Sequence, residues 1–356
     1  MKKNIHIFLI GTGNVGKAFL KHISENNVIE TKGGLFNFRV VGVANRSGML
    51  LNKKGIKLND RKFKPTEKGF IPKIESFILK MKEIGLPNSV FIDCTDGKDI
   101  AQYYDTILQS IPIVTPNKSA NSDVYKKYHT LRRITEKYKT DFRYSANVGV
   151  GLPTLDIINS LILGGDKIVA IEGLFSSTMN FLLDKLLTTN KKFSELLKEA
   201  NKKGLTEPDP RNDLNGIDTA RKLLILARES GARIEMSDIE IENLVPVILR
   251  NINSLDNFYE SIKIIDNKFD QLKKKALGYK SKLVYSASYN KKSASVKIKL
   301  VNKNHPFYSV SANEKVVLIY SEFYKKFPLV IKGISGGAEA TAKVLASDIM
   351  KIVNKN

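Results

Sequence analysis

The chain has 356 residues, a length that favours two domains with separate hydrophobic cores. Its formal charge of +22 would suit an anionic partner, but the lysines are spread along the chain without basic tails or interleaved aromatic residues, so we expect no nucleic-acid partner. No apolar run approaches the roughly 20 residues of a membrane helix, and Cys94 is the only cysteine, so we expect a soluble, cytoplasmic protein without disulfides or a membrane partner.

The first third of the chain alternates between short apolar runs and helical patterns. Residues 5–10 form an apolar run, broken by His6 and closed at Gly11, which predicts a buried first strand and leaves no room for a signal peptide. A helix over 15–24 and a strand over 38–44 complete a βαβ unit. Further elements are expected as a helix over 71–84, a strand over 89–94, a helix over 99–108 and a strand over 111–114. This alternation predicts an α/β fold, a doubly wound parallel sheet of the Rossmann type.

The pattern changes after Gly149 to longer helices and then to alternating strands. The strands are expected at 283–287, 295–300, 316–320 and 329–331, which indicates a second domain of α+β type. The chain becomes helical again after a glycine-rich turn, and we expect this helix to return to the first domain. The predicted divisions are a dinucleotide-binding domain over 1–148, a second domain over 149–332 and the returning C-terminal helix over 333–356.

A glycine turn follows the first strand and opens the first helix, with the spacing G-x-G-x-x-G. The spacing alone is weak evidence, because glycine turns are common. Between a strand and a helix, however, the first glycine permits a tight turn, the second lets the backbone approach a pyrophosphate, and the third allows close helix packing. The free N–H groups of the helix also favour phosphates. We therefore predict a dinucleotide site, rather than a plain turn, at Gly11, Thr12, Gly13, Asn14, Val15 and Gly16.

The end of the second strand indicates which dinucleotide binds. NAD enzymes place an acidic residue there against the ribose 2′-hydroxyl, but this chain has Asn45, Arg46 and Ser47. An arginine fork beside a hydroxyl matches a 2′-phosphate, so Arg46 and Ser47 favour NADP, with NAD possible. The alternative is that Arg46 is a solvated surface residue. Thr95 and Lys118 also fall at carboxyl ends of predicted strands, where such sheets hold their ligand.

The densest polar cluster covers residues 206–222, with the sequence T-E-P-D-P-R-N-D-L-N-G-I-D-T-A-R-K. Its first half contains two prolines and is expected to be a loop. Its second half has helix-forming composition, which predicts a helix over about 216–229 that ends at Gly231.

This cluster has the composition of a substrate site. Asp218 and Lys222 are four residues apart and would share a helix face, which in isolation suits a surface salt bridge. Glu207 and Asp213 in the adjoining loop add carboxylates that could hold a small cationic amino acid. A lysine whose pKa is brought towards neutrality by burial and neighbours could also donate a proton to an aldehyde oxygen.

Residues 200–246, together with 116–118, 147–153 and the glycine-rich C-terminal turn, resemble homoserine dehydrogenase, above all the dehydrogenase part of the bifunctional aspartokinase–homoserine dehydrogenases. The resemblance spans nearly the whole chain in the family's order, and the run T-E-P-D-P-R-x-D-L-x-G-x-D-x-A-R-K is unbroken. It implies a cytoplasmic oxidoreductase that uses NAD(P)H to interconvert L-aspartate 4-semialdehyde and L-homoserine in threonine and methionine biosynthesis.

The resemblance also implies residue roles. Lys222 would donate and accept the proton of the substrate oxygen, with Lys118 a second lysine near substrate and nicotinamide. Glu207 would bind the substrate amino group, while Asp213 and Asp218 would orient the substrate and the lysines. The remaining assignments are Thr178 in the substrate pocket and Thr95 and Gly337 against the cofactor. A twofold homodimer through the sheet of the second domain, the substrate-binding and dimerisation domain, is implied as well.

Two departures from the family concern ligand contacts. The family often has Glu at the position of Ser145, where it surrounds a monovalent cation with backbone carbonyls that match Val148, Val150 and Leu152. Because this charged ligand is missing, we expect weak dependence on sodium or potassium, or none. The family's C-terminal G-x-G-A-G turn is G-I-S-G-G over 333–337, which keeps the end glycines and loses the middle one.

Two other functions fit the same scaffold. One is a non-catalytic NADP-binding homologue, against which the complete set Lys118, Glu207, Asp213, Asp218 and Lys222 counts. The other is a different NADP-dependent dehydrogenase of a small amino or oxo acid. The sequence contains no aspartokinase portion and no appended regulatory domain, so feedback by threonine through such a domain is not expected.

Overall fold

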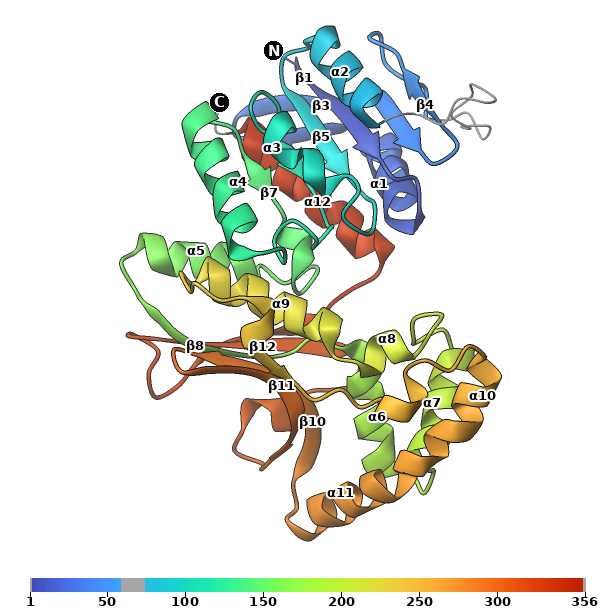
Figure 1. Cartoon of the computed structure of the whole chain (residues 1–356). Coiled ribbons are helices and arrows are strands. Elements are labelled where there is room, and N and C mark those ends of the chain that lie inside the picture. Colours follow the sequence, from blue (N-terminus) through green and yellow to red (C-terminus); the bar gives the residue numbers. More distant parts are fainter. Residues whose placement is uncertain (1, 59–73, 355–356) are drawn as a thin grey trace. The chain divides into compact units, whose positions relative to one another are not determined.

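The computed structural model describes residues 2–58 and 74–354 (Figure 1). It divides into two compact units, which we call the first unit (Met1–Gly151 with Gly336–Asn356) and the second unit (Leu152–Ser335). The divisions fall three residues later along the chain than the sequence analysis placed them. The first unit is therefore built from two segments that are separated by the whole of the second.

The first unit contains a seven-stranded sheet with the order β2-β3-β1-β5-β6-β7, and β4 pairs with β3. The strands are β1 (Lys2–Ile10), β2 (Val28–Thr31), β3 (Gly34–Asn45), β4 (Gly48–Leu51), β5 (Ser89–Asp93), β6 (Ile113–Val114) and β7 (Phe142–Arg143). The five strands from β3 to β7 along this order are parallel, which confirms the doubly wound α/β fold. The antiparallel strands β2 and β4 were not predicted.

Helices cover both faces of this sheet. They are α1 (Asn14–Glu25), α2 (Ile74–Ile84), α3 (Tyr104–Ile107), α4 (Tyr125–Tyr138) and α12 (Ala338–Val353), with 3-10 turns at Ala101–Tyr103 and Ser145–Asn147. Ile7 and Leu9 of β1 pack with α1 and α12 on one face, while Phe8 and Ile10 pack with α2 and α3 on the other. Because successive side chains point to opposite faces, a strand buried on both sides has the continuous apolar run seen in β1.

Two helix predictions in the first unit need comment. The helix expected over 99–108 is a 3-10 turn followed by the single turn α3. Of the helix expected over 71–84, the residues from Ile74 onward are helical, and its first three residues lie outside the described part of the chain.

The second unit is of α+β type, as predicted. Its sheet has the order β13-β12-β8-β10-β11-β9, with β8 (Ile168–Leu174), β9 (Ile239–Ile241), β10 (Lys282–Asn290), β11 (Ser293–Val301), β12 (Glu314–Ser321) and β13 (Leu329–Ile334). Its helices are α5 (Thr154–Leu163), α6 (Ser177–Thr188), α7 (Phe193–Lys202), α8 (Arg211–Leu214), α9 (Ile217–Glu229), α10 (Leu255–Ser261) and α11 (Asp266–Gly278).

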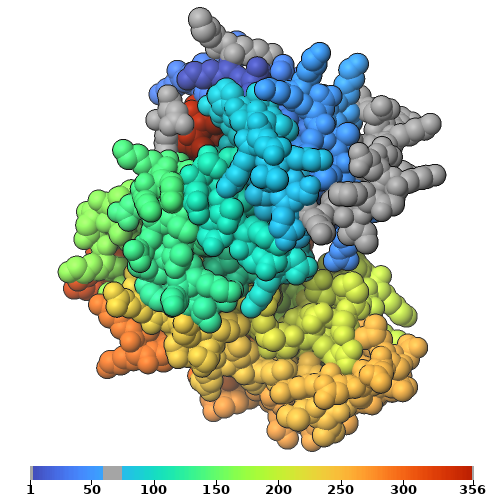
Figure 2. All heavy atoms as spheres, turned by 45° about the horizontal axis from the view of Figure 1, so that its top comes forward, coloured from blue at the N-terminus to red at the C-terminus, as the bar shows by residue number. Residues whose placement is uncertain are grey.

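Segments far apart in sequence meet within the second unit. Helix α7 packs against α11 and the 3-10 turn Ile262–Ile265, and these elements adjoin in both views (Figure 1 and Figure 2). Phe193 and Phe269 stack there with ring centroids 3.7 Å apart. Among the described helices, none is both long and apolar enough to cross a membrane.

Candidate active site

The glycine turn joins β1 to α1 with little room for side chains at two of its three glycines. A Cβ on Gly11, whose φ is +97°, would lie 2.7 Å from the carbonyl carbon of Cys94, and a Cβ on Gly16 would lie 1.9 Å from the Gly11 oxygen. A Cβ on Gly13 would meet nothing within 4 Å. The first and third glycines are therefore required by packing, whereas open space adjoins the second.

The N-terminus of α1 is suited to bind phosphate. Gly13 is its N-cap, no side chain caps the helix, and its first turn contains no acidic residue. The first N–H groups of a helix lack partners inside the helix, and the helix dipole favours an anion there. The glycine turn and the N-terminus of α1 thus fit the pyrophosphate of a dinucleotide.

The end of β3 lies against the glycine turn. Asn45 donates from Nδ2 to the Thr12 hydroxyl at 2.8 Å, and its Oδ1 accepts from the backbone N–H of Ser47 at 2.7 Å. Arg46 and Ser47 are exposed, and Arg46 forms no ion pair with the described residues. These contacts fix the backbone of residues 45–47 beside the turn and leave the Arg46 guanidinium available to a ligand.

Thr95 and Lys118 follow the carboxyl ends of the neighbouring strands β5 and β6. Between them lies Asp93, a fully buried carboxylate that accepts hydrogen bonds from Thr95 and Asn117. Gly337 belongs to the same unit, as the N-cap of α12 with φ +86° and no capping side chain. Thr95 and Lys118 are thus at the edge where parallel sheets of this kind hold their ligands.

Both carboxylate oxygens of Asp213, in the polar cluster of the second unit, accept hydrogen bonds. The Thr178 hydroxyl lies 2.7 Å from Oδ1 of Asp213 and 2.8 Å from the carbonyl oxygen of Leu205. The backbone N–H of Glu207 donates to the other carboxylate oxygen at 2.8 Å. Burial raises the pKa of Asp213, and the nearby charge of Asp218 raises it further. A carboxylate in this position is oriented rigidly and is only partly solvated.

Lys222 differs from a solvated surface lysine. Its ammonium lies 2.6 Å from Oδ2 of Asp218 and donates to the carbonyl oxygen of Phe175 at 3.1 Å. The Lys222 side chain is 14% exposed and that of Asp218 is 50% exposed. The ion pair predicted from the i,i+4 spacing is present, but its lysine points into the unit rather than into water. One ammonium proton remains available for a substrate oxygen.

The loop that carries Asp213 departs from the prediction. Residues 206–215 were expected to be a loop, yet Arg211–Leu214 forms the short helix α8, which begins after Pro210. Arg211 supports this turn because its guanidinium lies 2.6 Å from the Asp209 carboxylate and donates to the carbonyl oxygen of Ile252 at 2.6 Å. Proline is compatible with a helix start, where its missing N–H has no partner to lose.

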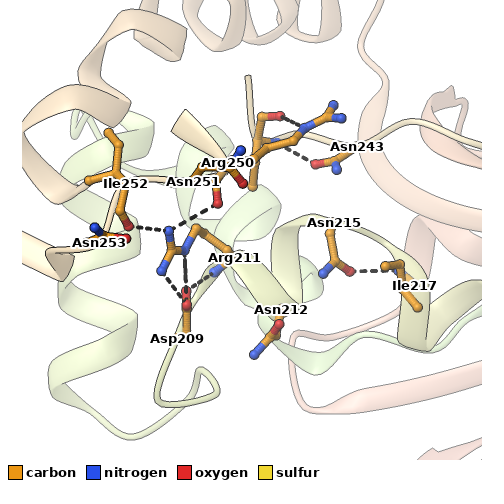
Figure 3. A pocket seen from close by; sticks show the side chains of 11 residues that line it. Asp209, Arg211, Asn212, Asn215, Ile217, Asn243, Arg250, Asn251, Ile252 and Asn253 are labelled. Carbon is orange, nitrogen blue, oxygen red and sulfur yellow. Dashed lines mark hydrogen bonds and ion pairs between the residues drawn. The ribbon is translucent and has the colours of Figure 1, made fainter. Parts of the chain in front are cut away.

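A polar pocket of about 540 Å³ lies on the Asn212 and Asn215 side of this turn (Figure 3). It is lined by Asp209, Arg211, Asn212, Asn215, Ile217, Asn243, Val245, Arg250, Asn251, Ile252 and Asn253. Figure 3 shows the Arg211 side chain between Asp209 and the segment that contains Ile252. The Asp209–Arg211 pair therefore anchors the loop on which Asp213 depends.

The residues proposed to hold a monovalent cation fit that role poorly. Ser145, at the position of the family's Glu, donates to the buried carboxylate of Asp348 from its backbone N–H at 2.9 Å and from its hydroxyl at 2.7 Å. The Leu152 carbonyl accepts from the N–H of Thr154 at 2.8 Å. Among the described residues, no cluster of three or more acidic, histidine or cysteine side chains could hold a metal. The backbone carbonyls of Val148 and Val150 would have to bind the cation without help from a charged side chain at position 145.

The sequence analysis singled out neither Asp93 nor Asp348, and it gave no role to the Asp209–Arg211 pair. Asp93 ends a buried apolar run, and this could have marked it, because a carboxylate is rarely buried without a purpose. Asp348 had no comparable signal, since its partner Ser145 lies 203 residues away.

Two family models cover most of the chain. Homoserine dehydrogenase matches residues 153–350, and the NAD binding domain of homoserine dehydrogenase matches residues 11–145. The second match agrees with the glycine turn and shows that the first unit has a domain that binds a nicotinamide dinucleotide.

Relatives in the curated proteins extend over the same length. The chain is 30% identical over 364 residues to homoserine dehydrogenase of Schizosaccharomyces pombe, covering 99% of this chain and 96% of the relative. It is 35% identical to bifunctional aspartokinase/homoserine dehydrogenase 1 of Arabidopsis thaliana over 99% of this chain, but it spans only 39% of that relative. The chain thus corresponds to less than half of the bifunctional proteins.

Solved structures agree on the fold. A Candida auris protein of unknown function matches with a TM-score of 0.90 and 30% identity, covering 99% of both chains. A hyperthermophilic archaeal homoserine dehydrogenase in complex with NADPH matches with a TM-score of 0.75 and 22% identity, covering 100% of this chain and 99% of that one. The family match over residues 153–350 and the Schizosaccharomyces pombe relative show that the chain belongs to the homoserine dehydrogenase family.

Proposed function

We propose that the chain interconverts L-homoserine and L-aspartate 4-semialdehyde with a nicotinamide coenzyme. The observation that carries this proposal is the cluster in the second unit, where a largely buried lysine pairs with Asp218 close to the hydrogen-bonded carboxylate of Asp213. A reductase of a small amino-acid aldehyde needs such a proton donor together with carboxylates that attract the substrate ammonium. We place the reaction in the cytoplasm.

The proposed roles follow from the chemistry of each side chain. Lys222 donates a proton to the carbonyl oxygen of the semialdehyde and takes it back in the reverse direction, and Asp218 holds its ammonium in place. The carboxylate of Glu207 binds the substrate ammonium. Asp213 orients the substrate and also accepts a hydrogen bond from the Glu207 backbone N–H. A bound NADPH supplies the hydride that reduces the aldehyde carbon.

The remaining proposals concern the other predicted contacts. Thr178 lines the substrate pocket through the hydroxyl that contacts Asp213, and Lys118 is a second lysine near substrate and nicotinamide. The residues proposed to bind the coenzyme are Gly11, Thr12, Gly13, Asn14, Val15, Gly16, Arg46, Ser47, Thr95, Lys118 and Gly337.

One experiment tests the proposed function. Purified protein is incubated with L-homoserine and either NADP or NAD, and the absorbance of the reduced nicotinamide is followed. We expect homoserine-dependent reduction, and oxidation of NADPH when aspartate semialdehyde is supplied. The absence of signal with both coenzymes would rule out the proposal, and activity with another small hydroxy acid but not with homoserine would point to a different dehydrogenase.

We infer a preference for NADP over NAD from the exposed guanidinium of Arg46 beside the glycine turn. Arg46→Asp should shift the preference towards NAD, because it replaces a partner of the 2′-phosphate with an acceptor for the 2′-hydroxyl. The measurement is the ratio of kcat/KM with NADP to that with NAD. Arg39→Asp, a charge reversal of the same kind further back in β3, is the control and should leave this ratio unchanged. An equal ratio in wild type and Arg46→Asp would show that Arg46 does not contact the ribose.

We expect activity to depend weakly, or not at all, on sodium or potassium. Ser145 offers no charge, its hydroxyl already donates to Asp348, and affinity for hard cations rises with ligand charge. Activity is titrated with sodium chloride, with potassium chloride and with a bulky organic chloride at matched ionic strength, so that screening is constant. A saturable requirement for a small cation would contradict this expectation.

Ser145→Glu offers a further measurement of the cation site. The new carboxylate would face the buried carboxylate of Asp348, and like charges repel strongly when they are poorly solvated. We therefore expect a lower Tm than wild type in the organic salt, and partial recovery in sodium chloride. A Tm that responds equally to all salts would show that the carbonyls of Val148, Val150 and Leu152 cannot complete a site.

We also propose a homodimer through the sheet of the second unit. Val330 and Ile334 of the edge strand β13 are 44% and 82% exposed, and Phe323 and Phe327 in the preceding loop are exposed as well. Exposed apolar residues along a sheet edge commonly mark an interface. Light scattering during size-exclusion chromatography measures the mass, and a monomer at micromolar concentration would contradict the proposal.

A further inference from the structure

We propose that Asp93 is a positioning residue that joins the loops after β5 and β6 and thereby prepares the site for the nicotinamide half of the coenzyme. The proposal rests on the proposed function, since it assumes that Thr95 and Lys118 act on the nicotinamide side. It concerns a residue that contacts neither substrate nor coenzyme directly, and that acts through the two loops it holds.

Asp93 is unusual because it is a buried carboxylate without a cationic partner. Its side chain is 0% exposed, and it forms no ion pair within residues 2–58 and 74–354. Desolvation of a carboxylate is costly, and an apolar side chain would fill a purely structural core position at lower cost. Retention of the carboxylate therefore calls for a role that an apolar residue could not perform.

Four hydrogen bonds converge on the two carboxylate oxygens. Oδ1 accepts from the backbone N–H of Thr95 at 2.8 Å and from its hydroxyl at 2.6 Å. Oδ2 accepts from the phenol of Tyr104 at 2.6 Å and from Nδ2 of Asn117 at 3.1 Å. Burial raises the pKa of Asp93, whereas these donors lower it. Oδ1 binds the loop after β5, and Oδ2 binds α3 and the loop after β6. The carboxylate therefore bridges the two loops.

The loop after β6 is attached to this bridge at several points. The Thr115 hydroxyl donates to the carbonyl oxygen of Asp93 at 2.7 Å. Asn117 donates from the same amide nitrogen to Oδ2 of Asp93 and, at 2.8 Å, to the carbonyl oxygen of Gly97 in the other loop. The Asn117 oxygen accepts from the N–H of Ser119 at 2.9 Å. The residues on both sides of Lys118 are thus fixed relative to Thr95 through one carboxylate.

A third segment reinforces this arrangement. Asn147, which is buried, donates from Nδ2 towards the carbonyl oxygens of Thr115 and Asn117, and its Oδ1 accepts from Asn121 at 2.9 Å. The loop that carries Lys118 is therefore held from two directions, while its link to Thr95 depends on Asp93 and Asn117.

Asp93→Asn disturbs this link with almost no change in volume. An amide offers one oxygen and one NH2 group. If its oxygen faces Thr95, its NH2 group faces the NH2 group of Asn117, and two donors oppose each other. Rotation of the Asn117 amide would relieve this conflict, but it would lose the bonds to Gly97 and Ser119. In either case the loops after β5 and β6 are no longer held in a fixed position relative to each other.

The test compares two ligands by isothermal titration calorimetry with intact protein. NADPH spans the whole coenzyme, whereas adenosine 2′,5′-bisphosphate carries only the adenosine, its 2′-phosphate and one further phosphate. We expect Asp93→Asn to weaken NADPH binding by about tenfold, the effect of losing one hydrogen bond to a charged group. Binding of adenosine 2′,5′-bisphosphate should be unchanged. Asp105→Asn is the matched control, because it removes an exposed carboxylate from the adjacent α3, and both ligands should bind it as they bind wild type.

Each outcome bears on the proposal. Equal weakening of both ligands would indicate general loosening of the first unit and would overturn it, as would unchanged NADPH binding by a variant with the wild-type Tm. If Asp93→Asn does not fold, Asn117→Ala replaces it, since this change cuts the same link and leaves the bonds between Asp93 and Thr95 in place. Failure of wild type to oxidise homoserine while it binds NADPH would count against the proposed function and not against the role of Asp93.

Discussion

Lys222→Ala should remove nearly all turnover while NADPH binding stays unchanged. Positioned proton transfer contributes about 10²- to 10⁴-fold to a rate, and kcat should fall within that range. The ammonium of Lys222 is bound to Asp218 and to the Phe175 carbonyl inside the second unit, whereas the dinucleotide turn belongs to the first. Loss of this side chain therefore affects the reacting oxygen and leaves the coenzyme site intact.

The measurements for this variant are steady-state kcat with homoserine and the Kd of NADPH from titration. Lys202→Ala removes an exposed lysine at the end of α7 and should leave both values at wild-type level. A loss of NADPH binding that matches the loss of turnover would show that Lys222 supports the fold and does not carry the proton.

Asp213→Asn should lower kcat/KM for homoserine by roughly 10- to 100-fold, because the Asp213 charge is proposed to orient the substrate and a hydrogen bond to a charged group is worth about 1.5–3 kcal/mol. The amide can keep both contacts: its oxygen accepts from the N–H of Glu207, and its NH2 group donates to the Thr178 hydroxyl, which in turn donates to Leu205. The substitution therefore removes the charge and preserves the local structure.

Three measurements separate charge from structure at Asp213. The Tm should stay close to wild type, and Asp256→Asn, an exposed carboxylate in α10, should leave kcat/KM unchanged. Burial raises the pKa of Asp213, so wild-type activity should fall as the pH decreases through that raised pKa, where the carboxylate takes up a proton. The variant should lack this step. Wild-type kcat/KM in Asp213→Asn would exclude a role for the charge.

Local sequence patterns predicted the strands whose side chains are buried on both faces of the sheet. The run of residues 5–10 predicted β1, because both faces of that strand are buried and nearly every side chain is apolar. Strand β8, at the centre of the second sheet, was missed, since Glu172 and Gly173 interrupt its pattern. The glycine is needed there, as a Cβ would lie 2.2 Å from the ring of Phe175. Tertiary packing, and not local propensity, places this strand.

The candidate site was predictable only where its residues are neighbours in sequence. The pair of Asp218 and Lys222 follows from helical periodicity, and the helix predicted for it agrees with α9. The bridge at Asp93 and the contact of Ser145 with Asp348 join residues from separate elements. These contacts depend on which elements lie side by side in the fold, and the local patterns of one sequence do not specify that arrangement.

The divided first unit has a consequence for how the chain is made. Ala342, Leu345 and Ile349 of α12 complete the core against Ile7 and Leu9 of β1, yet they are translated after the entire second unit. On the ribosome, the second unit can close its own core while one face of the first sheet is covered by α1 and still lacks α12. Exposed apolar strands of this kind are prone to aggregate, so the sheet of the first unit is exposed to aggregation until α12 has been made.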